Sequence, residues 1–233
     1  MRQLLLLSNS TNHGERYLAH AADTMIELVG DRRSILFVPF ALRDRAGYTA
    51  KFRTRLEELG FAVDELAADA TGARQIETAA AVFVGGGNTF RLLKTMQESD
   101  LLEPLRARAL AGMPYMGASA GINLAGPTIR TTNDMPIVEP DGFAALGLVP
   151  FQINPHYLDA DPGSTHMGET REERIAEFHE ENTTAVVGLR ERAWIRVAGD
   201  RAWLGGDRGA RIFRRGAAPE ERASGETLDD LLV

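Results

Sequence analysis

The chain has 233 residues, of which 44% are hydrophobic and 25% are charged, and its formal net charge at pH 7 is −7. This size allows one folded domain with a large core, and the acidic balance with scattered Lys and Arg excludes a nucleic-acid-binding surface. No apolar run approaches the roughly 18 residues that a membrane span requires, and the absence of cysteine excludes disulfides, thiol nucleophiles and cysteine-bound zinc.

Apolar strands and amphipathic helices alternate through the first two thirds of the chain. Residues 4–7 and 35–39 are nearly uniform apolar runs, typical of parallel strands buried on both faces. The elements predicted after them are a helix at 48–59, a strand at 62–66, a helix at 73–80 and a strand at 81–84. This alternation predicts an α/β fold with a doubly wound, mostly parallel sheet, helices on both faces and right-handed crossovers.

Three consecutive glycines, Gly85–Gly87, end the strand at 81–84 and precede an amphipathic helix. They indicate a close approach of the backbone at the carboxyl edge of the sheet. Neither a dinucleotide fingerprint nor a Walker lysine follows, so a phosphate site is not favoured. The N–H of Gly86 or Gly87 is better suited to stabilise a developing oxyanion, and the alternative is a turn that only permits close helix packing.

The pattern Gly117-Ala118-Ser119-Ala120-Gly121 is that of a nucleophile elbow, a sharp turn between a strand and a helix. An apolar strand end precedes it and a helix start follows, so the required context is present on both sides. Ser119 would project its hydroxyl from the turn, and the N–H of Ala120 at the helix start would face an oxyanion. The alternative is that Ser119 only caps the helix.

A serine nucleophile needs a base, and His156 is the preferred histidine because it follows the predicted strand at 149–153. His166, in a loop rich in Asp, Pro and Gly, is the competitor. Asp159, Asp161 and His166 also resemble metal ligands in type, but their spacing matches no ligand motif, and no metal is expected. Asp134 and Glu191 are both candidates for the carboxylate that orients the imidazole. Alternatively, Asp134 is only a turn residue before Pro136, and Glu191 is only a hairpin carboxylate paired with a neighbouring arginine.

The last third of the chain changes pattern. Short predicted strands separated by turn residues indicate a small C-terminal antiparallel extension, at 186–189, 194–197, 202–204 and 211–213. Residues 217–233 are charged and poor in large apolar side chains, so they are predicted to form a loosely held tail. Residues 1–216 would then form a single α/β domain.

Several long motifs resemble those of peptidase E, a family of cytoplasmic α-aspartyl dipeptidases. The similar segments are residues 4–11, 84–90, 117–121, 127–138, 152–156 and 168–174. The resemblance implies a fold like that of class I glutamine amidotransferases, with serine in place of the nucleophilic cysteine. It also implies a Ser-His-Glu triad, whose roles fall on Ser119, His156 and Glu191, although some descriptions of the family give the acidic role to the Asp134 position.

The implied activity is that of a serine dipeptidase hydrolysing Asp-Xaa through an acyl-enzyme, with Gly87 and Ala120 as oxyanion donors and no cofactor. An acidic protein that accepts an aspartate side chain needs a local cation; Arg171 is the first choice and Arg130 the second. Alternatively, Arg171 only begins a helix and pairs with surface carboxylates. The segment Arg190-Glu191-Arg192-Ala193 departs from the family, for which Pro-Glu-Gly-Asn is expected.

Two other functions fit the same features. A cyanophycinase-like enzyme would share the elbow but cleave β-aspartyl bonds, and a non-catalytic protein would only bind a small acidic metabolite. The expected protein is cytoplasmic, since the N-terminus lacks a secretory pattern. Its expected partner is a small peptide substrate, with no nucleic acid and no membrane, and the chain would be a monomer or a small homo-oligomer.

Overall fold

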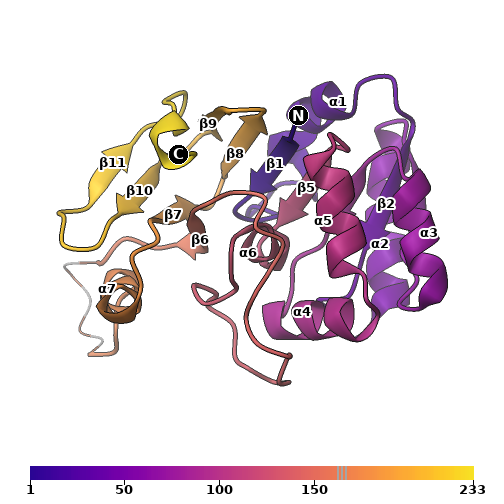
Figure 1. Ribbon diagram of the computed structural model, residues 1–233. Coiled ribbons are helices and arrows are strands. Elements are labelled where there is room, and N and C mark those ends of the chain that lie inside the picture. Colours follow the sequence, from indigo (N-terminus) through magenta and orange to yellow (C-terminus); the bar gives the residue numbers. More distant parts are fainter. Residues whose placement is uncertain (162, 164, 166) are drawn as a thin grey trace.

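The computed structural model describes residues 1–161, 163, 165 and 167–233, which form two sheets and their covering helices (Figure 1). The strands are β1 (Gln3–Leu7), β2 (Ser34–Val38), β3 (Ala62–Glu65), β4 (Val82–Val84), β5 (Tyr115–Ala118), β6 (Gln152–Tyr157), β7 (Val186–Arg190), β8 (Ala193–Ala198), β9 (Arg201–Gly206), β10 (Ala210–Phe213) and β11 (Glu220–Arg222). The α-helices are α1 (Ala22–Val29), α2 (Arg45–Glu58), α3 (Ala70–Thr78), α4 (Thr89–Glu98), α5 (Leu102–Leu110), α6 (Ala120–Ala125) and α7 (Arg171–Glu181). None of the helices in the described part of the chain has the length and apolar character needed to cross a membrane.

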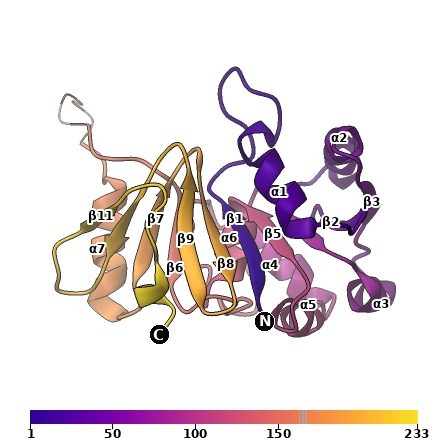
Figure 2. The same cartoon turned by 90° about the horizontal axis from the view of Figure 1, so that it is seen from above.

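The larger sheet has the strand order β3-β2-β4-β5-β1-β8-β9. The first five strands are parallel to their neighbours, whereas β8 and β9 are antiparallel additions at one edge. The predicted α/β fold with a mostly parallel sheet is therefore confirmed. Figure 2 shows the parallel strands and their helices on one side of the molecule and the C-terminal strands on the other.

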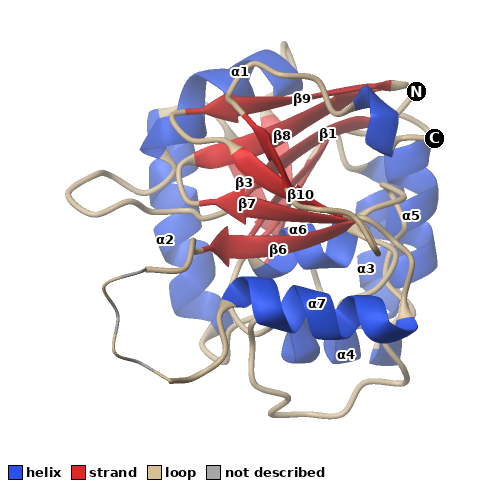
Figure 3. Ribbon diagram, turned by 90° about the vertical axis from the view of Figure 1, so that its left-hand side faces the viewer, coloured by secondary structure: helices blue, strands red, loops and turns tan. Residues whose placement is uncertain are grey.

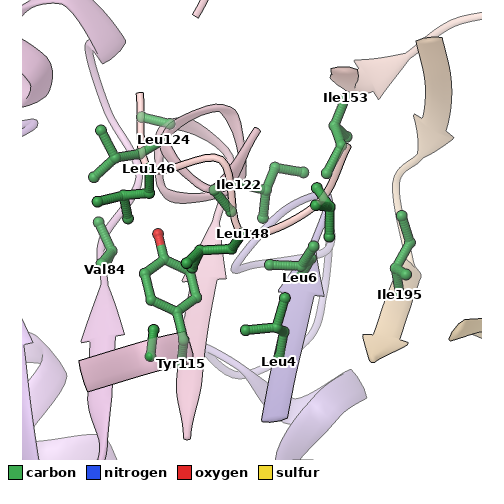
Figure 4. Packing of buried hydrophobic residues seen from close by; sticks show 14 of the residues in the cluster. Leu4, Leu6, Val84, Tyr115, Ile122, Leu124, Leu146, Leu148, Ile153 and Ile195 are labelled. Carbon is green, nitrogen blue, oxygen red and sulfur yellow. The ribbon is translucent and has the colours of Figure 1, made fainter. Parts of the chain in front are cut away.

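Alternate residues of the interior strand β1 face two different cores, which explains its uniform apolar sequence. Leu5 and Leu7 pack with α1 and α2 on one face of the sheet. Leu4 and Leu6 pack on the opposite face with α4, α5, α6 and the second sheet. Figure 4 shows Leu4 and Leu6 beside Tyr115 of β5 and Ile122 of α6 in this second core.

The second sheet has the order β11-β10-β7-β6, in which β6 and β7 are parallel and the other pairs antiparallel. One face packs into the large core through Ile153 and Val187. The other is covered by α7 (Figure 3). Ile175 and Phe178 of α7 pack there against Tyr157 and Phe213. The predicted C-terminal strands thus belong to both sheets, because β8 and β9 extend the larger one.

Residues 217–233 differ from the loosely held tail that their charge predicts. Strand β11 pairs with β10, and a short 3-10 helix (Asp229–Leu231) ends the described chain. Leu228 is fully buried and Leu231 nearly so, in the large core. Two leucines at the right positions anchor a segment that is otherwise largely small, polar or charged, and average composition does not detect them.

Candidate active site

Ser119 lies in the turn between β5 and α6, at the carboxyl edge of the parallel sheet. Its φ of 52° and ψ of −109° are costly for a residue with a side chain. The turn is held by hydrogen bonds from the Ser119 N–H to the Leu7 carbonyl and from the Ile122 N–H to the Ser119 carbonyl. The surrounding structure therefore forces the backbone into the strained geometry expected of a nucleophile elbow.

The two glycines of the elbow are needed because other backbone passes close to them. A Cβ at Gly121 would lie 2.3 Å from the Val84 carbonyl oxygen, and one at Gly117 would lie 2.7 Å from the Gly121 carbonyl oxygen. Both distances are below van der Waals contact, and the opposing atoms are backbone. Helix α6 can therefore start tightly against β4 and β5 only with glycine at these two positions.

His156 lies within β6, which runs from Gln152 to Tyr157, and not after a strand at 149–153 as the sequence predicts. The β6–β7 register shifts between Asn154 and Tyr157, and His156 has a φ of 51°. This irregularity turns the imidazole toward β5, with Nε2 at 2.9 Å from Ser119 Oγ. The competitor, His166, is outside the described residues.

Glu191 lies in the turn between β7 and β8, with Oε1 at 2.7 Å from His156 Nδ1. An ionised carboxylate can only accept, so Nδ1 donates to it and Nε2 is left to accept the serine proton. The side chains of His156 and Glu191 are 38% and 52% exposed, so the pair is accessible from solvent. Serine, imidazole and carboxylate thus form one continuous chain of contacts.

Asp134, the other acidic candidate, contacts a different part of the molecule. Its Oδ2 accepts from the Thr89 N–H at 2.8 Å, from the Thr89 hydroxyl at 2.6 Å and from the Thr132 hydroxyl at 3.1 Å. Thr89 is the first residue of α4, so Asp134 satisfies a free donor at a helix N-terminus. Of the two carboxylates, Glu191 is the one that lies against the imidazole.

The glycine segment after β4 lies beside the elbow because β4 and β5 are neighbouring strands. A Cβ at Gly86 would be 3.1 Å from the Ser119 Cβ, and Gly87 has a φ of 133° that glycine adopts without strain. Among the described residues, the N–H groups of Gly87 and Ala120 donate no hydrogen bond to the protein. Ala120 directly follows Ser119, and Gly87 directly follows Gly86, so both N–H groups are candidate donors near the serine.

Buried polar side chains hold His156 and Glu191 in place, and motif analysis did not assign them a role. The Ser8 hydroxyl accepts from the His156 N–H at 2.9 Å and donates to the Leu189 carbonyl at 2.8 Å. The Asn9 Oδ1 accepts from the Arg192 N–H at 3.0 Å. Both residues directly follow β1, and polar residues at the end of a buried strand are the signal that identifies such supports.

The two arginines expected to bind an acidic side chain differ in their burial and in their contacts. Arg171 is the first residue of α7, behind a capping box of Thr170 and Glu173, and is half-buried. Burial lowers the pKa of its guanidinium, and nearby Arg174 lowers that pKa further. Arg171 forms no ion pair with a carboxylate of the described chain, whereas exposed Arg130 stacks on the Phe143 ring at 4.9 Å.

Comparison with known proteins identifies the family to which the chain belongs. The model of Peptidase family S51 matches residues 4–205. Peptidase E of Streptomyces coelicolor is 57% identical over 229 residues, 98% of this chain and 94% of its own length. A Drosophila melanogaster protein named "Probable alpha-aspartyl dipeptidase" is 48% identical, over 99% of this chain and 98% of its own. A crystal structure of a peptidase from an acI-B1 Actinobacterium has the same fold, with a TM-score of 0.73 at 17% identity, covering 98% and 96% of the two chains. The chain belongs to Peptidase family S51.

Proposed function

We propose that this protein is a serine dipeptidase that removes the N-terminal aspartate from Asp-Xaa dipeptides. The observation that carries the proposal is the contact chain from Ser119 Oγ through His156 to Glu191, with distances of 2.9 and 2.7 Å, at a strained strand-to-helix turn. The names of the relatives from Streptomyces and Drosophila supply the substrate class.

In the first half of the reaction, Ser119 Oγ attacks the carbonyl carbon of the aspartyl residue while its proton passes to His156 Nε2. Glu191 keeps the imidazole in the tautomer that accepts this proton and stabilises the cation that results. The N–H groups of Gly87 and Ala120 bind the tetrahedral oxyanion. A donor of this type lowers a barrier by roughly 2.7 to 4 kcal/mol.

In the second half, the intermediate collapses and the C–N bond breaks. His156 gives its proton to the leaving amine, which departs as the C-terminal amino acid. Water then attacks the aspartyl ester of Ser119, with His156 taking a proton from the water and returning it to the serine oxygen. The products are free aspartate and the second amino acid, and the enzyme is regenerated.

Arg171 is proposed to bind the aspartate side chain, because burial partly desolvates its guanidinium and no carboxylate of the described residues pairs with it. We expect Arg171→Met to lower kcat/KM for Asp-Leu by at least about 10²-fold, with a much smaller loss for the poor substrate Asn-Leu. Steady-state kinetics with both dipeptides measures this. Arg174→Met is the matched control, since Arg174 lies one turn along α7 in an exposed pair with Glu169 at 3.5 Å. Equal losses on both substrates would show that Arg171 supports the local structure and does not bind the side chain. An unchanged rate with Asp-Leu would favour Arg130 as the residue that binds it.

The proposed function is tested by comparing five compounds: Asp-Leu, its β-linked isomer, Glu-Leu, Asn-Leu and acetyl-Asp-Leu. We expect rapid hydrolysis of α-linked Asp-Leu and little of the others. Preference for the β-linked isomer would replace the proposal with a cyanophycinase-like activity. No turnover, together with no adduct between Ser119 and a serine-directed phosphonylating reagent, would indicate a metabolite-binding protein.

A further inference from the structure

Glu191 has an arginine on each side, and all three side chains line one cavity of about 350 Å³. An arginine within reach of a carboxylate can form a bidentate pair, which would occupy both carboxylate oxygens. Among the described residues, however, the one ion pair that Glu191 makes is with His156. The two flanking guanidinium groups must therefore be held by other groups.

Arg190 is bound by two carboxylates from outside its own strand. Its Nε and Nη2 donate to Asp159 at 2.8 and 2.6 Å, and its Nη1 and Nη2 donate to Glu221 of β11 at 3.0 and 3.2 Å. The side chain is only 19% exposed. These contacts raise the pKa of Arg190, and the hydrogen bonds to Asp159 make the largest contribution. Arg190 in turn lowers the pKa of Asp159.

Arg192 is bound by two further carboxylates in the same manner. Its Nε and Nη2 donate to Asp207 at 2.9 and 2.7 Å, and its Nη1 lies 2.6 Å from Glu15. Four carboxylates from four separate segments thus neutralise the two arginines that flank Glu191. The other cationic or titratable groups at the cavity wall are Tyr157, His13 and Arg208. Tyr157 is buried, which raises the pKa of its phenol to about 12, whereas His13 and Arg208 are exposed, so solvent screens them.

The turn itself is fixed by backbone contacts and does not need the arginine side chain. The Arg192 N–H donates to Asn9 Oδ1 at 3.0 Å, and the Arg192 carbonyl accepts from the Asp207 N–H at 3.1 Å. Arg192 has a φ of 71°, in the left-handed region that glycine prefers. Glycine at this position would therefore keep the turn and remove the guanidinium.

We propose that Glu15, Asp207, Asp159 and Glu221 are positioning residues for the hydrolysis, because they keep the flanking arginines away from Glu191. The inference rests on the proposed role of Glu191 in orienting His156. A released guanidinium would form a fork with Glu191, withdraw it from the imidazole and oppose the imidazolium of the transition state. These carboxylates act through Glu191 and not through the substrate, so their loss lowers kcat and leaves KM nearly unchanged.

The test is a cycle of variants around Arg192. We expect Glu15→Gln/Asp207→Asn to lower kcat for Asp-Leu by about tenfold or more, with KM changed less than about threefold. Arg192→Gly alone keeps kcat within about threefold of the parent, and adding the two carboxylate substitutions to Arg192→Gly costs less than about twofold more. Asp230→Asn, which breaks an exposed Arg–Asp pair with Arg214 at 2.5 Å on the C-terminal segment, is the matched control and leaves kcat unchanged.

Equal losses from the carboxylate substitutions with and without Arg192 would overturn the inference, since they would show a purely structural role. So would full activity of Glu15→Gln/Asp207→Asn, or an inactive but folded Arg192→Gly. Thermal unfolding of each variant checks the fold. Glu191→Gln is assayed in parallel: if it is impaired while the carboxylate pair has no effect, this inference alone fails. If Glu191→Gln is fully active, the proposed role of Glu191 in orienting His156 is wrong, and the inference that rests on it is wrong as well.

Discussion

Ser119→Ala is expected to lower kcat for Asp-Leu by at least roughly 10⁴-fold, because the proposed mechanism forms the acyl-enzyme on the Ser119 hydroxyl. The loss is in kcat, since the hydroxyl is proposed to react with the substrate and not to bind it. The measurement is steady-state hydrolysis by the purified variant, together with mass spectrometry after treatment with a phosphonylating reagent. We expect one adduct on the parent protein and none on the variant.

The control for Ser119→Ala is the thermal unfolding of the variant. Its hydroxyl is not needed for capping, since no side-chain cap bond forms at the start of α6. The variant should therefore unfold at about the parent temperature. Hydrolysis of Asp-Leu at the parent rate by a folded Ser119→Ala protein would refute the serine mechanism.

Glu191→Gln is expected to lower kcat by roughly 10³ to 10⁴-fold, by analogy with loss of the acidic member in other triads. A neutral amide can donate to Nδ1, which would leave Nε2 protonated and unable to accept the serine proton. The change in KM should be small because Glu191 faces the imidazole. Steady-state kinetics of the variant with Asp-Leu gives both values.

Asp134→Asn provides the comparison for Glu191→Gln. The substitution weakens the acceptor at the start of α4, and a lost cap of this kind costs about 1 kcal/mol of stability. We expect a lower free energy of unfolding in urea, with kcat reduced less than about tenfold. The opposite ranking of the two variants would move the acidic role to Asp134.

The parallel core and the elbow could be predicted because each depends on residues that are close in sequence. Uniform apolar runs identify buried strands, and Gly117 and Gly121 bracket Ser119 within five positions. The carboxylate partner of His156 was left open, because Asp134 and Glu191 are 22 and 35 residues away from it. Only the placement of β7 beside β6 brings Glu191 to the imidazole.

Two features depended on tertiary contacts that local patterns do not encode. The bulge in β6 that turns His156 toward Ser119 is supported by the Ser8 hydroxyl, which is 148 residues away in sequence. The composition of the C-terminal segment is largely polar, yet Leu228 is buried in the core beside β9. In both cases one or two side chains outweigh the average character of the segment.

The interior position of β1 has a consequence for biosynthesis. Its neighbours are β5, which pairs Tyr115 with Leu4, and β8, which pairs Val197 with the same residue. At a synthesis rate of about 5–20 residues per second, β1 waits on the order of ten to forty seconds for its second partner. A nascent chain that has not yet reached residue 191 lacks β8 and the turn that carries Glu191, so the carboxylate proposed to orient His156 joins the site only after the whole parallel part of the sheet has been made.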